Sequence, residues 1–385
     1  MEIRELDPDD LDAALDVRSR SFGPLPGAHH DLWRQMTGRA IAGRRQLAAY
    51  DGARVVATAR INDFVQWWHG RPVRMAGVGG VVVAPEHRGR GASGALMRAV
   101  LVRSRELGYP LSALFPATVR PYRAVGYEIA GERQVVDLPS EALRRLAGDT
   151  SGLRRAAPSD ARTVIDALGA GYAADRVDGP YTWAAEEVAA DLEDDDVLGY
   201  LADDGFVGYE FDGGERLTVH ELAAGSAATR RTLWSLVGSG SSVAPVVRAA
   251  LAPRDPLWWW LDENQIQVQH REWWMLRVID PVAAIAARGF PSGLVVEVPL
   301  VLDDPVLNDG GPTAYRLTVH DGAATLHPTE TTDGIRLGPQ GLAALFAGTS
   351  TGALRAAGLA QGGDRGQDAV LDAAFAAEPF MTVHF

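Results

Sequence analysis

The stretch that decides the expected fold lies at residues 78–97 and reads VGGVVVAPEHRGRGASGALM. Its β-branched run at 81–83 predicts a strand, which must stop at Pro85 because proline has no N–H for a ladder hydrogen bond. Beyond a glycine-rich loop at 88–94, apolar residues recur with helical spacing between Leu96 and Leu101. The stretch therefore predicts a strand, a glycine-rich loop and the start of a helix.

The glycine-rich loop is suited to an anion. Glycines let the backbone approach a phosphate closely, and the first turn of a helix presents N–H groups that lack partners. Arg88 and Arg90 add positive charge at the same place. We interpret the loop as a pyrophosphate site, and the alternative is a solvated Gly/Arg turn. Arginine alone is weak evidence here, since the chain has no lysine and all 37 of these basic residues are arginine.

The spacing within the loop indicates the kind of cofactor. The loop lacks the G-x-x-x-x-G-K-[ST] of a P-loop and the G-x-G-x-x-G of a dinucleotide fold. It resembles instead Arg-x-x-Gly-x-(Gly/Ala), the acetyl-CoA signature of the GCN5-related N-acetyltransferases (GNATs). Arg88 and Gly91 occupy the first two fixed positions, and Ser93 stands where the family has Gly or Ala. The resemblance implies acetyl-CoA as a co-substrate.

A second match lies downstream, at residues 109–127. An apolar strand expected at 111–115 is followed by a helical turn bearing Tyr122 and then by the run Val-Gly-Tyr at 125–127. This order is similar to the GNAT pattern of a strand followed by Tyr-x-x-x-Gly-(Phe/Tyr), in which the first tyrosine faces the sulfur of the cofactor. Amine attack on a thioester expels a thiolate, which a nearby phenol can protonate. Tyr122 is therefore the candidate general acid, and its alternative role is a packing aromatic with a satisfied hydroxyl.

Composition limits the class of protein. A chain of 385 residues with 46% hydrophobic and 23% charged residues can form two or three globular domains. Its net charge of −13 argues against nucleic acid as a partner and favours a cationic ligand. The apolar runs are too short to span a membrane, the acidic first residues do not resemble a secretory signal, and the lack of cysteine excludes disulfides. We expect a cytoplasmic protein without a membrane partner.

The chain contains a weak internal repeat. Each copy predicts a strand, turn and helix, then a hairpin, then a strand, loop and helix. The matching segments are 3–10 and 153–160, 47–61 and 197–211, and 78–101 and 217–236. The second loop, at 224–231, has lost the glycine spacing. We read a duplicated acetyltransferase fold whose second copy is degenerate and binds no cofactor; the alternative is coincidence between two α/β domains.

The last part of the chain changes character near Gly289. Segments 294–302 and 315–320 alternate like antiparallel strands, and three helical patterns follow. This arrangement resembles a sterol-carrier-type α+β domain. The expected organisation is a catalytic GNAT domain at 1–150, a degenerate GNAT-like domain at 151–288 and a sterol-carrier-like domain at 289–385.

Over its whole length the chain resembles the enhanced intracellular survival (Eis) family of aminoglycoside and lysine N-acetyltransferases. The most specific match is Val-x-Val-x-Pro-x-x-Arg-x-Arg-Gly at 81–91, together with Tyr122 and the aromatic last residue. In that family the C-terminal carboxylate is the general base, which implies the same role for Phe385. The family also forms homohexamers. Two departures are Ala117 and Thr118 in place of a polar pair before the tyrosine, and Gly89, which interrupts an arginine run.

The expected site residues follow from these matches. The catalytic pair is Tyr122 and Phe385, and no metal is expected because the histidines have no partners at metal-ligand spacing. The residues expected to bind the cofactor are Val81, Val82, Val83, Arg88, Gly89, Arg90, Gly91, Ala92, Ser93, Gly94, Ala117 and Thr118. The expected acceptor is an amine of a cationic small molecule, with several positions open to acetylation. The alternatives are a protein lysine, a metabolite amine, or a non-catalytic protein that binds acyl-CoA or lipid.

Overall fold

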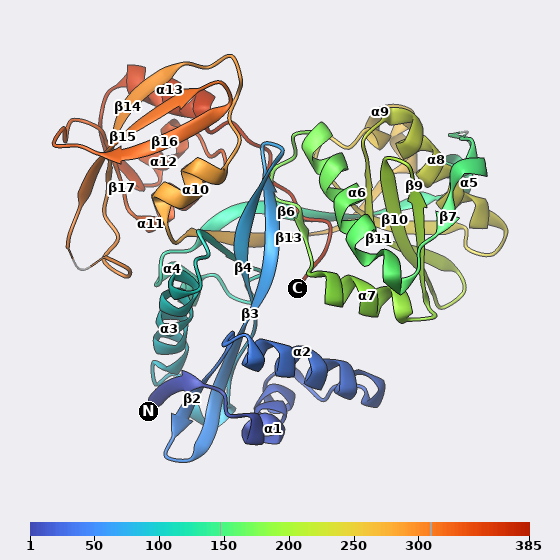
Figure 1. Cartoon of the computed structure of the whole chain (residues 1–385), viewed down its shortest axis with the longest axis horizontal. Helices are drawn as coiled ribbons and strands as arrows, with labels where there is room; N and C mark the ends of the chain where they lie inside the picture. The colour runs from blue at the N-terminus through green and yellow to red at the C-terminus, as the bar shows by residue number, and fades with distance from the viewer. Residues whose placement is uncertain (147, 309) are drawn as a thin grey trace.

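Three lobes meet at a common centre in the computed structural model, which describes residues 1–146, 148–308 and 310–385 (Figure 1). The N-terminal lobe is at the bottom of this view, the middle of the chain forms the lobe at the right, and the last part forms the lobe at the upper left. The C-terminus ends in the middle of the molecule, where the three lobes meet. No helix within the described residues is long and apolar enough to cross a bilayer.

The first lobe is built on five strands that lie in space in their chain order. The strands are β1 (Glu2–Glu5), β2 (Gln46–Asp51), β3 (Arg54–Trp68), β4 (Arg71–Val83) and β5 (Leu111–Leu114), and the helices are α1 (Leu11–Phe22), α2 (His30–Ala42), α3 (Ala92–Glu106) and α4 (Arg120–Arg123). Neighbouring strands are antiparallel except β4 and β5, which are parallel because α3 makes the crossover between them. The apolar stripe expected between Leu96 and Leu101 is buried on α3.

The second lobe repeats this plan. Its strands are β7 (Arg154–Arg155), β9 (Val197–Ala202), β10 (Gly205–Asp212), β11 (Arg216–Ala224) and β12 (Val246–Leu251), and its helices are α6 (Ala161–Ala174), α7 (Ala185–Glu193), α8 (Ala227–Gly238) and α9 (Leu257–Trp260). The strands β11 and β12 are again parallel and joined by a helix, here α8. The two hairpins and the two crossovers of the expected repeat are therefore both present. Two short elements connect the lobes: α5 (Ser140–Arg144), and β8 (Tyr181–Thr182), which pairs with β3.

Two long strands merge both lobes into one sheet of 13 strands. Strand β13 (Gln267–Val278) follows the second lobe in sequence, yet it lies between β5 and β6 (Glu128–Pro139). Met275 pairs with Leu114 of β5 on one side, and Trp273 pairs with Glu132 of β6 on the other. Because β6 also pairs with β12, the sheet is continuous from one lobe to the other. The boundaries expected near residues 150 and 288 stay a prediction, since strands are shared across them.

The third lobe is a five-stranded sheet with helices, as expected for an α+β domain. It contains β14 (Val296–Leu302), β15 (Thr313–His320), β16 (Ala323–Pro328), β17 (Ile335–Leu337), β18 (Ala360–Gly362), α10 (Pro281–Ala287), α11 (Pro339–Phe346), α12 (Thr351–Ala356) and α13 (Arg365–Ala374). The sequence pattern predicted β14, β15 and the last three helices. It missed β16, β17 and β18. Strands β17 and β18 span only three residues, too few for periodicity to show, and β16 has Leu326 as its one large apolar residue, so its alternation is weak.

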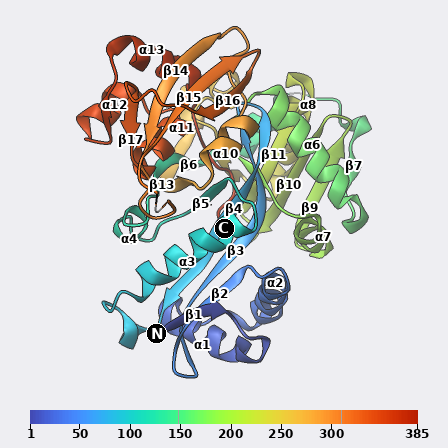
Figure 2. The same ribbon diagram turned by 60° about the vertical axis from the view of Figure 1, so that its left-hand side comes forward.

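Figure 2 shows the third lobe above the first, with α11 beside the shared strands β6 and β13. A buried arginine links these parts. Arg277 of β13 is 0% exposed and donates to the carbonyl of Val125 at 3.1 Å and to Asp304 of the third lobe at 2.6 Å. A buried guanidinium needs such an anionic partner, since leaving a charge unpaired in the interior costs several kcal/mol. The ion pair therefore fixes the third lobe against β13.

Removing this charge tests the contact. We expect Asp304→Asn to lower the melting temperature by roughly 5 °C or more, because the amide cannot neutralise the buried Arg277. Asparagine still offers Oδ1 to the N–H groups of Val306 and Leu307, which Asp304 caps at 3.2 Å. Differential scanning calorimetry measures the change. The control is Glu297→Gln, which removes the exposed ion pair to Arg316 and is expected to change little; equal effects of the two substitutions would contradict the prediction.

Candidate active site

The glycine-rich loop has the geometry of an anion site. Gly89 and Gly91 have φ angles of +74° and +81°, a region that L side chains rarely adopt. Gly91 is the N-cap of α3, and having no side chain it leaves the first N–H groups of the helix uncapped. Arg88 and Arg90 are exposed beside them. The residues at 88–94 therefore fit a pyrophosphate, with Ala92, Ser93 and Gly94 forming the first turn of α3.

A gap between two strands lies next to this loop. Strands β4 and β5 pair only from Met75 to Gly77, so the later part of β4 has no strand partner on that edge within the described residues. Gly80, with φ +59°, interrupts the register of β4 with β3. Val82 and Val83 are paired with β3 on one edge, and Val81 lies with Gly80 in the register shift. The other edge of these residues is open to an extended ligand. This arrangement suits Val81, Val82 and Val83 for the expected contact with a cofactor arm.

Tyr122 lies on α4, which follows the loop after β5. Its side chain is half-buried, and its ring centre is 6.2 Å from that of Tyr127. Burial raises the pKa of Tyr122 above its ordinary value, so the hydroxyl stays protonated at neutral pH. Ala117 and Thr118 are exposed in the loop that leads to this helix. All the residues expected to bind the cofactor thus lie on β4, on the loop and first turn of α3, or between β5 and α4.

The last residues of the chain leave the third lobe and run between the other two. Phe380 donates its N–H to Asp178 of the second lobe at 3.0 Å, and Met381 donates to Glu132 of β6 at 3.2 Å. The Nε of Arg133 donates to the carbonyl of Thr382 at 2.9 Å. Figures 1 and 2 both show the C-terminus beside β3 and β4. The chain end is therefore held by two backbone hydrogen bonds, to the carbonyls of Asp178 and Glu132, and by one from the Arg133 side chain.

The Phe385 ring packs among three aromatic side chains. Its centroid is 4.9 Å from Phe64, 5.2 Å from Tyr181 and 5.5 Å from Phe115, each in an edge-to-face arrangement. Pairs of this kind each stabilise by about 0.5–1.5 kcal/mol beyond the buried area. The adjacent His384 stacks on Phe115 at 4.3 Å. The ring thus anchors the end of the chain against β3 and β5.

Two glycines of β4 make room for the chain end. A Cβ on Gly77 would lie 2.2 Å from Cε2 of Phe64 and 3.1 Å from Cε2 of Phe385. A Cβ on Gly79 would lie 3.8 Å from the carboxyl carbon of Phe385 and 3.5 Å from Nδ2 of Asn62. The terminal carboxyl group thus lies against the part of β4 where the strand has separated from β5. Sequence reasoning missed Asn62, which is 7% exposed and whose Nδ2 has no hydrogen-bond partner among the described residues.

An acidic cavity of about 300 Å³ adjoins the chain end. Its lining includes Trp183, Asp191, Glu210, Glu221 and Val383, which is two residues before the terminus. Burial, with a smaller effect from Asp191, raises the pKa of Glu221 to about 8. A cation entering this cavity would therefore favour ionisation of Glu221. The sequence carried no signal for these acids, because they come from α7, β10 and β11 and meet only in the folded chain.

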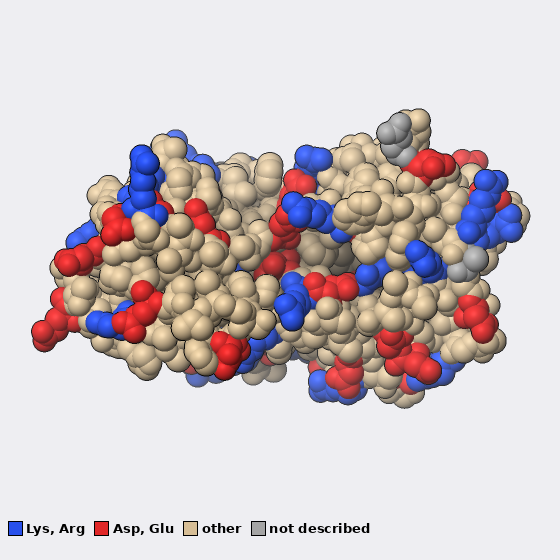
Figure 3. All heavy atoms as spheres, turned by 90° about the horizontal axis from the view of Figure 1, so that it is seen from above, with Lys and Arg blue, Asp and Glu red and all other residues tan. Residues whose placement is uncertain are grey.

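A second cavity, of about 320 Å³, shares Trp183 and Asn62 with this region and is lined by both signs of charge. Arg39 and Glu187 form an ion pair across it at 3.1 Å. Figure 3 shows that acidic and arginine side chains are also interspersed over the face seen from above. The negative net charge is thus spread over the surface, and Asp191, Glu210 and Glu221 gather in one cavity. Among the described residues, no group of three His, Asp or Glu side chains could hold a metal ion.

Comparison with known proteins finds matches along the whole chain. Residues 2–130 and 178–278 each match the model of an acetyltransferase (GNAT) domain, and residues 281–382 match that of a sterol carrier protein domain. A solved GCN5-related N-acetyltransferase from Kribbella flavida is 44% identical, with a TM-score of 0.94 and coverage of 100% of this chain and 98% of that one.

Curated relatives are more distant. An uncharacterized N-acetyltransferase of Streptomyces avermitilis is 27% identical, over 93% of this chain and 92% of its own length. The N-acetyltransferase Eis of Mycobacterium tuberculosis is 28% identical, over 79% of this chain and 78% of its own.

The space left by Gly77 can be tested directly. We expect Gly77→Ala to displace the Phe385 ring, because the added methyl group overlaps Phe64 and presses on Phe385. Release of phenylalanine by a carboxypeptidase should become several-fold faster. Gly79→Ala is the matched control, since its methyl group would meet nothing closer than 3.5 Å. Equal release rates in the wild type and Gly77→Ala would show that the ring is not held at this place.

Proposed function

Because this chain belongs to the Eis family of GCN5-related N-acetyltransferases, enzymes that transfer acetyl from acetyl-CoA to an amine, we propose that its acceptor is a cationic small molecule such as an aminoglycoside. More than one amine of that molecule would be open to reaction. The observation that carries the proposal is the terminal carboxyl group of Phe385 beside Gly79, at the point where β4 separates from β5. The same C-terminal segment lines an acidic cavity through Val383.

The residues on the loop and on β4 suit acetyl-CoA. The uncapped first turn of α3, with Arg88 and Arg90, would hold the pyrophosphate, and the open edge of residues 81–83 would pair with the pantetheine arm. When bound, acetyl-CoA supplies an activated thioester. The N–H groups of β4 would polarise its carbonyl, since a fixed donor stabilises charge without reorganising.

The reaction removes one proton from the acceptor amine and adds one to the leaving sulfur, and Phe385 and Tyr122 would carry out these two transfers. The acceptor amine arrives mainly as an ammonium ion, and the Phe385 carboxylate would accept its proton directly or through a water molecule. A carboxylate is a weak base in water, so its partly buried position supports the role. The hydroxyl of Tyr122 would then protonate the leaving sulfur. Its raised pKa keeps that proton available at neutral pH.

The acidic cavity supports a cationic acceptor. Asp191, Glu210 and Glu221 place carboxyl groups at several points along one cavity, and a bound cation would favour their ionised form. Trp183 offers an aromatic face for a sugar ring or a cation. A molecule with several amines could bind there in more than one orientation. A homohexamer and a cytoplasmic location, expected from the family resemblance and the composition, stay predictions.

Product mass tests the proposal. The protein with its natural C-terminus is incubated with acetyl-CoA and an aminoglycoside that has several amines. We expect the aminoglycoside to gain one or more acetyl groups in the mass spectrum. Acetylation of a lysine peptide without any gain by the aminoglycoside would replace the proposed acceptor with protein lysine.

Removing one hydroxyl tests the proposed acid. We expect Tyr122→Phe to lower kcat roughly 100-fold and to leave the affinity for acetyl-CoA unchanged, because general acid catalysis contributes about that much. Steady-state kinetics and a CoA binding assay measure the two effects. The control is Tyr127→Phe in the same core, whose hydroxyl is 2.7 Å from that of Ser112. A kcat of wild-type size in Tyr122→Phe would remove this residue from the mechanism.

Moving the chain end tests the proposed base. One residue added after Phe385 shifts the carboxylate away from Gly79, and we expect kcat to fall roughly 100-fold. A semisynthetic protein that ends in a Phe385 carboxamide is the sharper variant, since it keeps the ring and loses only the charge. The same protein ligated with a free carboxylate is its control. Full activity of the carboxamide would exclude the terminal carboxylate as base.

A further inference from the structure

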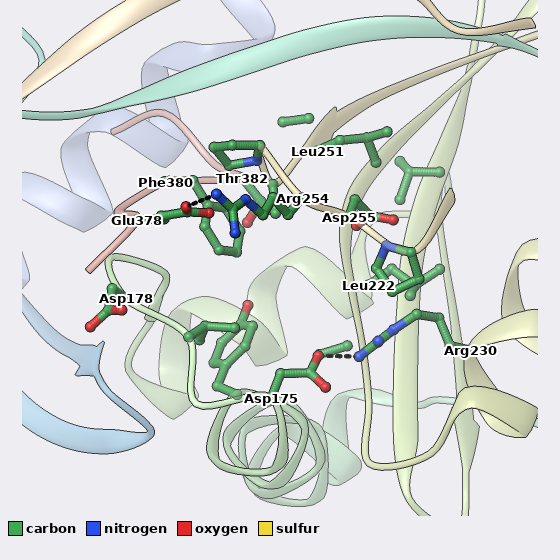
Figure 4. A pocket seen from close by; sticks show the side chains of 18 of the residues that line it. Asp175, Asp178, Leu222, Arg230, Leu251, Arg254, Asp255, Glu378, Phe380 and Thr382 are labelled. Carbon is green, nitrogen blue, oxygen red and sulfur yellow. Dashed lines mark hydrogen bonds and ion pairs between the residues drawn. The ribbon is translucent and has the colours of Figure 1, made fainter. Parts of the chain in front are cut away.

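The second lobe contains its own gap between parallel strands. Strands β11 and β12 pair from Arg216 to Val219 and then separate, just as β4 and β5 do after Gly77. A cavity of about 370 Å³ fills this gap (Figure 4). It is lined by the end of β11, the loop after β12, residues of α6 and α8, and the C-terminal segment at 378–382. The cavity thus occupies in the second lobe the position that the cofactor arm would occupy in the first.

The loop beside this cavity is unsuited to a pyrophosphate. Ser226 caps α8 by accepting from the N–H of Thr229 at 3.2 Å, so this N–H is already used. The hydroxyl of Thr229 in turn donates to Asp204, whose carboxylate also lies next to Gly225. A negative charge therefore stands where the first lobe has Arg88 and Arg90. The cavity was retained while its anion-binding loop was lost, which calls for a different ligand.

The charges in the cavity indicate the chemical class of its ligand. Figure 4 shows two ion pairs facing across it, Asp175 with Arg230 on one side and Arg254 with Glu378, at 2.8 Å, on the other. Each pair is neutral as a unit. Asp255 forms no ion pair with any described residue. Among the described residues, its carboxylate accepts one hydrogen bond, from the N–H of Leu257 at 2.9 Å.

Asp255 is half-buried in the cavity wall, and the cation that acts on it, Arg230, is itself paired with Asp175. Burial raises the pKa of Asp255 to about 6, and the opposing effects of the Leu257 N–H and of Arg230 are smaller. Arg176 also lines the cavity, but it is exposed and solvated. The rest of the wall includes Asp178, whose side chain accepts from the N–H of His69, and His220, beside the apolar Leu222, Leu251 and Phe380. A small apolar cation would pair with Asp255 and cover this wall.

We propose that this cavity is a second binding site, for a small alkylammonium ligand whose cationic group pairs with Asp255. The site adjoins the acidic cavity, with His220 lining both, but it lies in the second lobe, and acetylation does not occur there. Its wall includes Glu378, Phe380 and Thr382, and the last of these is three residues before Phe385. A bound ligand would therefore change the position or the mobility of the chain end. The regulatory part of this inference rests on the proposed function, and the binding part does not.

Calorimetric titration without acetyl-CoA tests the binding. The probe is N,N-dimethylbutylammonium, which can donate one N–H to a carboxylate but, as a tertiary amine, cannot form a stable amide. We expect it to bind the wild type and to bind Asp255→Asn roughly tenfold or more weakly, the loss of one charge-assisted hydrogen bond. The neutral N,N-dimethylbutanamide, of similar size, should not bind. No binding to the wild type, or equal binding to Asp255→Asn, overturns the proposal.

Further measurements test whether the probe binds at Asp255 and whether its binding affects the chain end. Asp255→Asn should fold normally, because its Oδ1 still accepts from Leu257 and no buried charge remains, and its melting temperature checks this. Glu221→Gln, in the acidic cavity, should leave the Asp255-dependent binding intact. Saturating probe should change the rate at which a carboxypeptidase releases Phe385 from the wild type and not from Asp255→Asn. An unchanged rate in the wild type would overturn the coupling to the chain end, even if acetylation itself failed.

Discussion

The insertion of β13 between β5 and β6 is the constraint on which the rest of the molecule depends. Without it β5, a strand of only four residues, would present an unpaired edge, and the two acetyltransferase lobes would be separate sheets. Trp274, Met275 and Leu276 are fully buried there. Because β13 leads directly into α10, its place in the sheet also determines where the third lobe begins, and Arg277 fixes that lobe through Asp304.

The position of the third lobe in turn determines where the chain ends. Its last helix, α13, stops at Ala374, and the eleven residues that follow (375–385) run between the first two lobes. This segment donates to the carbonyls of Asp178 and Glu132 and accepts from Arg133, which holds it to both lobes, and the Phe385 ring anchors it among three aromatic rings. Every polypeptide chain has a terminal carboxylate, so only its position in the fold makes this one special. Here the assembly of all three lobes brings it to β4, so the third lobe supplies the proposed base to a site on the first lobe.

The two strand gaps of the duplicated fold have diverged in charge. In the first lobe the gap ends at a helix with an uncapped N-terminus and two arginines, a setting for an anion. In the second lobe the helix is capped by Ser226, and the cavity wall includes Asp255, which forms no ion pair with a described residue and is the group proposed to bind a cation. The same C-terminal segment passes the second gap and ends at the first. A ligand in the second lobe would therefore contact the segment that ends at the proposed active site.

The sequence by itself determined the features that depend on neighbouring residues. Gly89 and Gly91 allow the left-handed turns of the loop, the spacing from Leu96 to Leu101 determines the buried face of α3, and the order of strand, Tyr122 and Gly126 places a phenol after β5. Only the tertiary structure decided the insertion of β13, the contact of Phe385 with Gly77 and Gly79, and the meeting of Asp191, Glu210 and Glu221. These features join segments separated by up to about 300 residues. Which side chains meet there depends on long-range strand register, and a one-residue slip would turn each side chain to the opposite face, so no local pattern can specify them.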